Sequence, residues 1–150
     1  MKKPDMKHLL LAVMAVVAVF FACIPNAVTV YFRPQEGADP IAPVTGSFFT
    51  LFEGVQGAIS LPAAGLCACV TLLLVGIYLA IRKTGLLTAV KWLSFASAML
   101  SCVLILIRSE DYFIVPNVMV PIAMMIEYGI CIYMTKKQAE TVEKVQLRRK

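Results

Sequence analysis

Four long apolar stretches alternate with short polar segments along this chain. They cover residues 9–32, 61–81, 86–107 and 113–135, and each comes close to or exceeds the roughly 20 residues that a helix needs to cross about 30 Å of hydrocarbon. This pattern is typical of an integral membrane protein with four transmembrane helices. The chain is therefore predicted to form a single all-α membrane domain over residues 1–150.

The polar segments between the later stretches leave room only for sharp reversals of the chain. Residues 82–85 join the second stretch to the third, and residues 108–112 join the third to the fourth. Connections of this length place consecutive helices side by side and antiparallel. We therefore expect an antiparallel four-helix bundle. Pro25 and Pro121 fall within apolar stretches and should kink their helices, because proline has no backbone N–H to donate.

Basic residues give the expected orientation in the membrane. One side holds twelve of the fourteen Lys and Arg residues, whereas the other holds only Arg33 and Arg108. Because Lys and Arg are enriched on the cytoplasmic side, both termini are predicted to be cytoplasmic, in a protein of the plasma membrane. The twelve are Lys2, Lys3, Lys7, Arg82, Lys83, Lys91, Lys136, Lys137, Lys144, Arg148, Arg149 and Lys150.

The first apolar stretch also has the anatomy of a secretory signal. Basic residues precede it, and the segment Phe-Phe-Ala-Cys at residues 20–23 is similar to a bacterial lipoprotein cleavage site. The apolar pattern continues past Cys23 to Phe32, which is longer than a signal core of about 7–15 residues needs to be. An uncleaved first span is the favoured interpretation, and a cleaved signal is the alternative.

Residues 33–60 form the one sizeable loop, which is expected on the outer side. Its first part is rich in Pro, Gly and acidic residues and should be extended and exposed. Residues 47–60 place apolar side chains on one helical stripe, which favours either a short interfacial helix on the outer leaflet or a cap packed over the bundle. The stripe consists of Phe48, Leu51, Phe52, Val55 and Ile59. On the opposite side, the basic tail over residues 136–150 should continue the last helix.

Composition supports a membrane as the main partner. Hydrophobic residues make up 60% of the chain, above the roughly 45–50% of a soluble domain. The net charge of +5 could suit nucleic acid or anionic lipid. Because the basic residues flank the apolar stretches and are not interleaved with aromatic residues, they favour the lipid bilayer and argue against nucleic acid.

Three polar residues within or beside the spans are candidates for an ion or proton site. Glu127 is the one acidic residue deep inside an apolar stretch, where a carboxylate is costly unless it is protonated, paired or hydrated. Lys91 lies at a similar depth and is able either to pair with Glu127 or to extend to the inner headgroups. Asn26, next to Pro25, would bond a freed carbonyl or serve as a ligand. His8 is expected to be solvated.

The cysteines do not indicate a disulfide-stapled outer domain, because all five lie in apolar stretches. Cys67 and Cys69 are weak candidates for a thiol relay, since their side chains lie about 200° apart around a helix. Packing as small apolar residues is favoured. The sequence has no metal-ligand cluster, phosphate-binding loop or nucleophile motif, so no metal, cofactor or catalytic residue is predicted.

Small residues recur at every fourth position in the second and third stretches and should let helices approach closely. The leading hypothesis is a non-enzymatic accessory subunit or oligomeric scaffold that acts through helix packing. Its expected partners are further copies of itself or a larger membrane complex. One alternative is a small oligomeric transporter or channel that uses Glu127 with Lys91, and a second is a membrane thiol oxidoreductase that uses Cys67 and Cys69.

Overall fold

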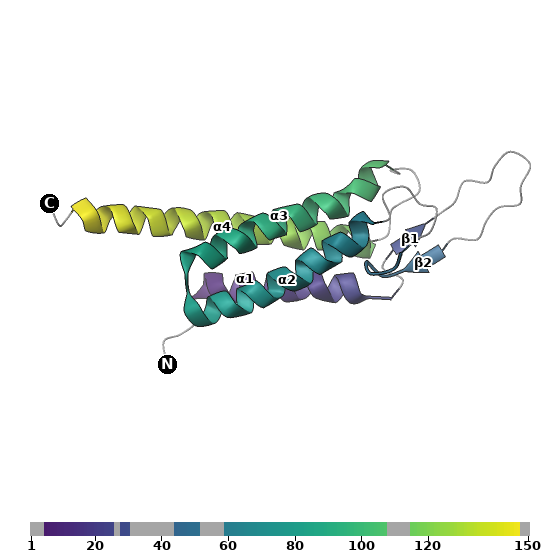
Figure 1. Cartoon of the computed structure of the whole chain (residues 1–150), viewed down its shortest axis with the longest axis horizontal. Coiled ribbons are helices and arrows are strands. Elements are labelled where there is room, and N and C mark those ends of the chain that lie inside the picture. The colour runs from purple at the N-terminus through teal and green to yellow at the C-terminus, as the bar shows by residue number, and fades with distance from the viewer. Residues whose placement is uncertain (1–4, 26–27, 31–43, 52–58, 108–114, 148–150) are drawn as a thin grey trace, which may run out of the picture.

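Six elements make up the part of the chain that the structure, a computed structural model, describes, namely residues 5–25, 28–30, 44–51, 59–107 and 115–147. Figure 1 shows the helices lying side by side, with the two strands near one end of the bundle and both the start of α1 and the end of α4 toward the other. The elements are α1 (Met6–Cys23), β1 (Val28–Val30), β2 (Val44–Gly46), α2 (Ser60–Ile81), α3 (Thr84–Ile107) and α4 (Val115–Leu147).

Four helices in the described residues are long and apolar enough to cross a membrane. This confirms the prediction of a helical membrane protein with four candidate spans. α4 continues as a helix through Leu147, so the tail extends the last helix as expected, at least to that residue. The limits of the first helix and the structure of the outer loop differ from the prediction.

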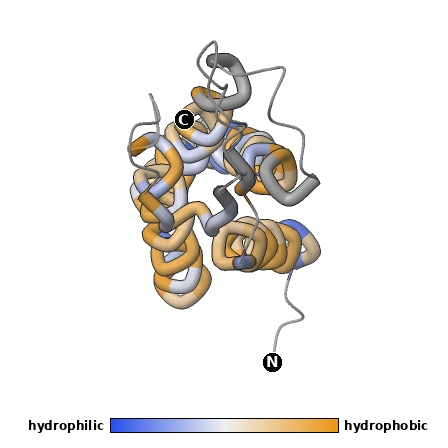
Figure 2. Tube along the Cα trace, turned by 90° about the vertical axis from the view of Figure 1, so that its right-hand side faces the viewer, coloured by the Kyte–Doolittle hydropathy of each residue, from blue (hydrophilic) through white to orange (hydrophobic). Residues whose placement is uncertain are grey.

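The four helices form a ring. α1 packs against α2 and α4, and α3 packs against the same two helices. Seen along the bundle in Figure 2, the helices carry predominantly hydrophobic residues around their circumference. Large apolar side chains such as Leu66, Leu73 and Trp92 point outward and are exposed. Because a hydrocarbon solvent tolerates such a surface and water does not, the outer face of the ring is suited to lipid.

Each of the four helices contributes an alanine to a buried cluster in the middle of the bundle. Ala18, Ala68, Ala98 and Ala123 are buried together with Met124, and we call this cluster the alanine waist. Side chains this small let helix backbones approach closely, and the resulting van der Waals contact is one of the forces that hold helices together in lipid. Larger buried side chains, among them Phe48 and Tyr78, fill the two ends of the bundle.

The first helix is shorter than the apolar stretch at residues 9–32. α1 ends at Cys23, and the next residue, Ile24, is extended with φ −61° and ψ 124°. Ile24 precedes Pro25, and the proline ring disfavours a helical conformation in the residue before it. Pro25 therefore ends the helix and does not kink it, which corrects the prediction. Pro121 does lie inside α4.

A small two-stranded sheet follows α1, and the sequence analysis did not predict it. β1 pairs antiparallel with β2, with Val28 opposite Gly46 and Val30 opposite Val44. The chain then forms a turn, in which the N–H of Thr50 donates to the carbonyl of Ser47 at 3.1 Å. Residues 47–51 thus form no helix, and the rest of the predicted interfacial helix, residues 52–58, lies outside the described residues.

The turn after β2 covers one end of the bundle. Phe48 is fully buried and packs with Ala22, Val28 and Leu61, and its N–H donates to the carbonyl of Ala22 at 3.3 Å. That bond satisfies one of the carbonyl groups that the last turn of α1 leaves without a partner in its own helix. Phe48 therefore packs over the end of the bundle, as in the second of the two predicted arrangements, whereas Leu51 and Ile59 of the same stripe are exposed and Phe52 and Val55 lie outside the described residues.

Candidate functional site

Glu127 lies on the inner face of α4 and is fully buried. Neither of its carboxyl oxygens has a hydrogen-bond partner among the described residues. Ser94 of α3 is its polar neighbour, but the Ser94 hydroxyl donates to the carbonyl of Val90 at 2.8 Å. Buried polar groups in folded proteins nearly always have partners, so an unpartnered carboxyl group requires an explanation.

The hydroxyl groups of the interior are already bonded to the backbone. Ser97 of α3 donates across the helix interface to the carbonyl of Ala64 in α2, at 2.9 Å. Other interior hydroxyls bond the carbonyl one turn earlier in their own helix at 2.7–2.8 Å, which satisfies the hydroxyl without requiring water. These residues are Thr71, Ser94, Ser101 and Thr135.

Lys91 is not paired with Glu127 in the structure. Its ammonium nitrogen lies 4.8 Å from the ring centroid of the adjacent Trp92, which is itself exposed on the outer face of α3. A lysine in this position keeps its stem on the apolar surface and its charge at the edge.

The remaining predicted site residues do not join this region. Cys67 and Cys69 are half-buried free thiols on α2, and the structure pairs neither in a disulfide. Asn26 lies outside the described residues. The described residues contain no group of three or more His, Cys, Asp or Glu side chains that could hold a metal ion. Of the predicted candidates that the structure describes, Glu127 is therefore the one in the bundle core.

Sequence reasoning missed a polar contact at the opposite end from the strands. His8, expected to be solvated, stacks on Tyr78 of α2 with ring centroids 5.8 Å apart, and its Nε2 lies 3.4 Å from the tyrosine hydroxyl oxygen. The two residues are 70 positions apart in the chain. Only the spacing of apolar residues, which places Tyr78 on the inner face of α2, could have suggested it.

Comparisons with known proteins add no family to this picture. No family model, no curated protein and no solved structure matches the chain.

Proposed function

We propose that this chain is a non-enzymatic membrane protein that acts through helix packing, as an accessory subunit or an oligomeric scaffold. The observation that carries the proposal is the interior of the bundle. The described helices meet at the alanine waist, and their interior hydroxyls donate to backbone carbonyls. An interior of this kind supports tight packing and offers few polar groups to a solute, which transport normally needs.

In this proposal the bundle is antiparallel and crosses the plasma membrane four times, with both termini in the cytoplasm. Contacts support the antiparallel order: Lys7, near the start of α1, lies over the ring of Tyr133 in the second half of α4. His8 contacts Tyr78, near the end of α2. The same end carries basic residues, which favours its placement on the cytoplasmic side. They are Lys7, Arg82, Lys83, Lys136 and Lys137.

Purification in a mild detergent at native expression level, followed by mass spectrometry of the intact complex, tests the proposed function. We expect either a foreign membrane protein at fixed stoichiometry or a closed homo-oligomer. A monomer without partners that moves protons or a solute across liposomes on its own would contradict the proposal.

Glu127 favours a second candidate function, a small oligomeric transporter or channel with this carboxyl group as its ion or proton site. Ionisable side chains within a membrane interior are costly and are commonly functional. Glu127 is fully buried and its oxygens have no hydrogen-bond partner in the described part of the chain. This is the environment in which a carboxyl group exchanges a proton or binds a cation.

Flux measurements in liposomes separate the two functions. If the chain transports, Glu127→Gln should abolish flux and leave the bundle folded, because Gln keeps the size of the side chain and removes its charge. Glu140→Gln provides the matched control, since Glu140 is on the same helix and exposed. Flux that is equal in both variants would eliminate the transporter with Glu127 as its site.

A further inference from the structure

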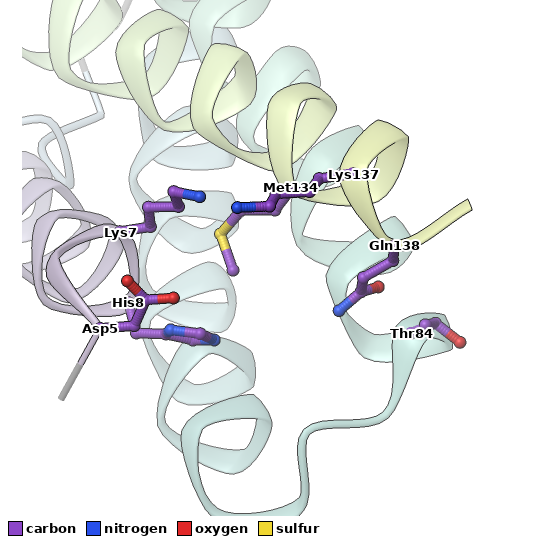
Figure 3. A pocket seen from close by; sticks show the side chains of 7 residues that line it. All are labelled: Asp5, Lys7, His8, Thr84, Met134, Lys137 and Gln138. Atoms are coloured by element: carbon purple, nitrogen blue, oxygen red, sulfur yellow. The ribbon is translucent and has the colours of Figure 1, made fainter. Parts of the chain in front are cut away.

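A pocket of about 410 Å³ lies at the end of the bundle where α1 and α3 begin. Side chains from three helices line it: α1, α3 and the second half of α4. Figure 3 shows these side chains around the opening. The volume is in the range of small-molecule sites and exceeds what a single small ion requires. The lining residues are Asp5, Lys7, His8, Thr84, Met134, Lys137 and Gln138.

Two lysines from different helices converge on this pocket. In Figure 3 the side-chain nitrogens of Lys7 and Lys137 point toward one another, and the Asp5 carboxylate adds an attractive electrostatic interaction with Lys7. The ring of Tyr133, centred 4.7 Å from Lys7 Nζ, holds that nitrogen in place through a cation–π contact. Two ammonium groups that face each other repel, and an anion bound between them would be attracted to both.

The ends of two helices add to the positive potential. Thr84 is the first residue of α3 and lines the pocket, and α1 begins one residue after Asp5. The first turn of a helix presents backbone N–H groups without intrahelical partners and the positive end of the helix dipole. The Asp5 side chain caps no N–H of α1. The lysines and the helix ends thus favour the same kind of ligand, an anion.

Two buried polar atoms of the lining residues indicate what else the ligand carries. Neither His8 Nδ1 nor Gln138 Oε1 has a hydrogen-bond partner among the described residues. His8 Nδ1 donates in the tautomer in which the Tyr78 hydroxyl donates to Nε2, and accepts in the other tautomer. Gln138 Oε1 and the Asp5 carboxylate are acceptors. The pocket therefore combines cationic and neutral donors with two acceptors, which suits a phosphate ester that also bears hydroxyl groups.

We propose that this pocket binds the phosphate of an anionic glycerophospholipid with a hydroxylated headgroup. Lys7 and Lys137 bind the phosphate oxygens, and Asp5 and Gln138 accept from the headgroup hydroxyls. Met134, which is almost fully buried, forms an apolar wall that suits the glycerol and the start of an acyl chain. Basic pockets at the ends of transmembrane helices commonly bind lipid phosphates in this way. A free phosphate ion carries the negative charge of this lipid but lacks its headgroup hydroxyls and its apolar part.

Native mass spectrometry of the full chain in detergent, titrated with phosphatidylglycerol, phosphatidylcholine or inorganic phosphate, tests this proposal. We expect the wild-type chain to retain phosphatidylglycerol in preference to phosphatidylcholine. Binding of inorganic phosphate that displaces phosphatidylglycerol would support the phosphate site and assign it to a soluble ligand. Equal retention of the two lipids by the wild-type chain would overturn the proposal, without requiring any variant to fold.

Charge-matched variants locate the site. Lys7→Gln/Lys137→Gln should weaken phosphatidylglycerol binding roughly thirtyfold, from the usual contribution of two basic side chains near an anionic headgroup. Lys83→Gln/Lys136→Gln removes the same charge from exposed lysines at this end that do not line the pocket, and should leave binding unchanged. Equal losses in the two double variants would show a diffuse attraction to the basic end and would contradict a defined pocket.

Discussion

At the scale of single residues, Glu127 differs from the buried hydroxyl residues in its hydrogen bonding. The hydroxyl groups around it donate to backbone carbonyls, whereas its own oxygens have no partner in the described residues. A buried polar group without a hydrogen bond costs about 1–3 kcal/mol in mutational measurements. The residue therefore lowers the stability of the bundle in which it lies.

Replacing Glu127 with an apolar side chain of similar size should stabilise the protein. We expect Glu127→Met to raise the free energy of unfolding in detergent by about 1–3 kcal/mol, because the substitution removes an unpartnered carboxyl group and keeps the volume. Thermal unfolding followed by circular dichroism measures the change. Glu140→Met, at an exposed position of the same helix, is the control and should change little. A lower stability for Glu127→Met would mean that the carboxyl group has a stabilising partner.

Two glycines of α2 provide a matched test of the cap. A Cβ atom at Gly65 would lie 2.9 Å from Cε1 of Phe49, whereas a Cβ at Gly76 would meet nothing within 4 Å beyond its chain neighbours and the backbone of its own helix. Gly76→Ala should therefore gain about 1 kcal/mol from helix propensity. Gly65→Ala should lose that gain, because the ring of Phe49 must move.

A double-mutant cycle isolates the contact. In a Phe49→Ala background, Gly65→Ala should become as stabilising as Gly76→Ala, since the methyl group then has space. The measurement is the free energy of unfolding in detergent. If Gly65→Ala is equally stabilising with and without Phe49, the cap does not pack on α2 as described.

Part of the site was predictable at this scale, and part was not. The burial of Glu127 followed from its position inside an apolar stretch. The absence of a Glu127–Lys91 pair could not be predicted in the same way. Two residues at the same depth in the membrane contact each other only if both helices are rotated so that the residues face one another, and Lys91 turns outward toward Trp92. The contact of His8 with Tyr78 likewise depends on how α1 lies against α2, which no local pattern encodes.

At the scale of elements, the end of α1 shows how a single residue sets a boundary. The apolar pattern continues beyond Cys23, and apolarity alone predicted a helix to residue 32. The steric effect of Pro25 on Ile24 ends the helix, and Val28–Val30 then pairs as β1. Each strand is only three residues long, Val-Thr-Val in β1 and Val-Thr-Gly in β2. So short a pattern cannot be distinguished in the sequence from the continuation of an apolar span.

The packing of the four helices against one another can be tested at the alanine waist. Ala68→Leu should destabilise the bundle by about 1–3 kcal/mol, because the added carbons do not fit where helices approach closely. Val70→Leu, on the exposed face of the same helix, should change little. Denaturation in detergent measures both. Equal effects of the two substitutions would show that the waist is not tightly packed.

At the scale of the whole molecule, the four helices form a ring with chemically different ends. The strands and the Phe48 cap close one end, and the other gathers basic side chains and the pocket between α1, α3 and α4. Hydropathy and length were sufficient to predict four helices of membrane-spanning length, because a hydrocarbon solvent imposes both. They could not predict the pocket, since it is made by residues that approach one another only in the assembled ring.

The central claim is that the ring crosses the membrane with its basic end in the cytoplasm, and labelling of single cysteines with a membrane-impermeant maleimide tests it most directly. The background is a variant in which the five native cysteines are replaced by alanine. Thr45→Cys, on the exposed hairpin, should react in intact cells, and Lys83→Cys, in the turn between α2 and α3, should react only after permeabilisation. Labelling of Lys83→Cys in intact cells, or protection of both positions until permeabilisation, would contradict the account.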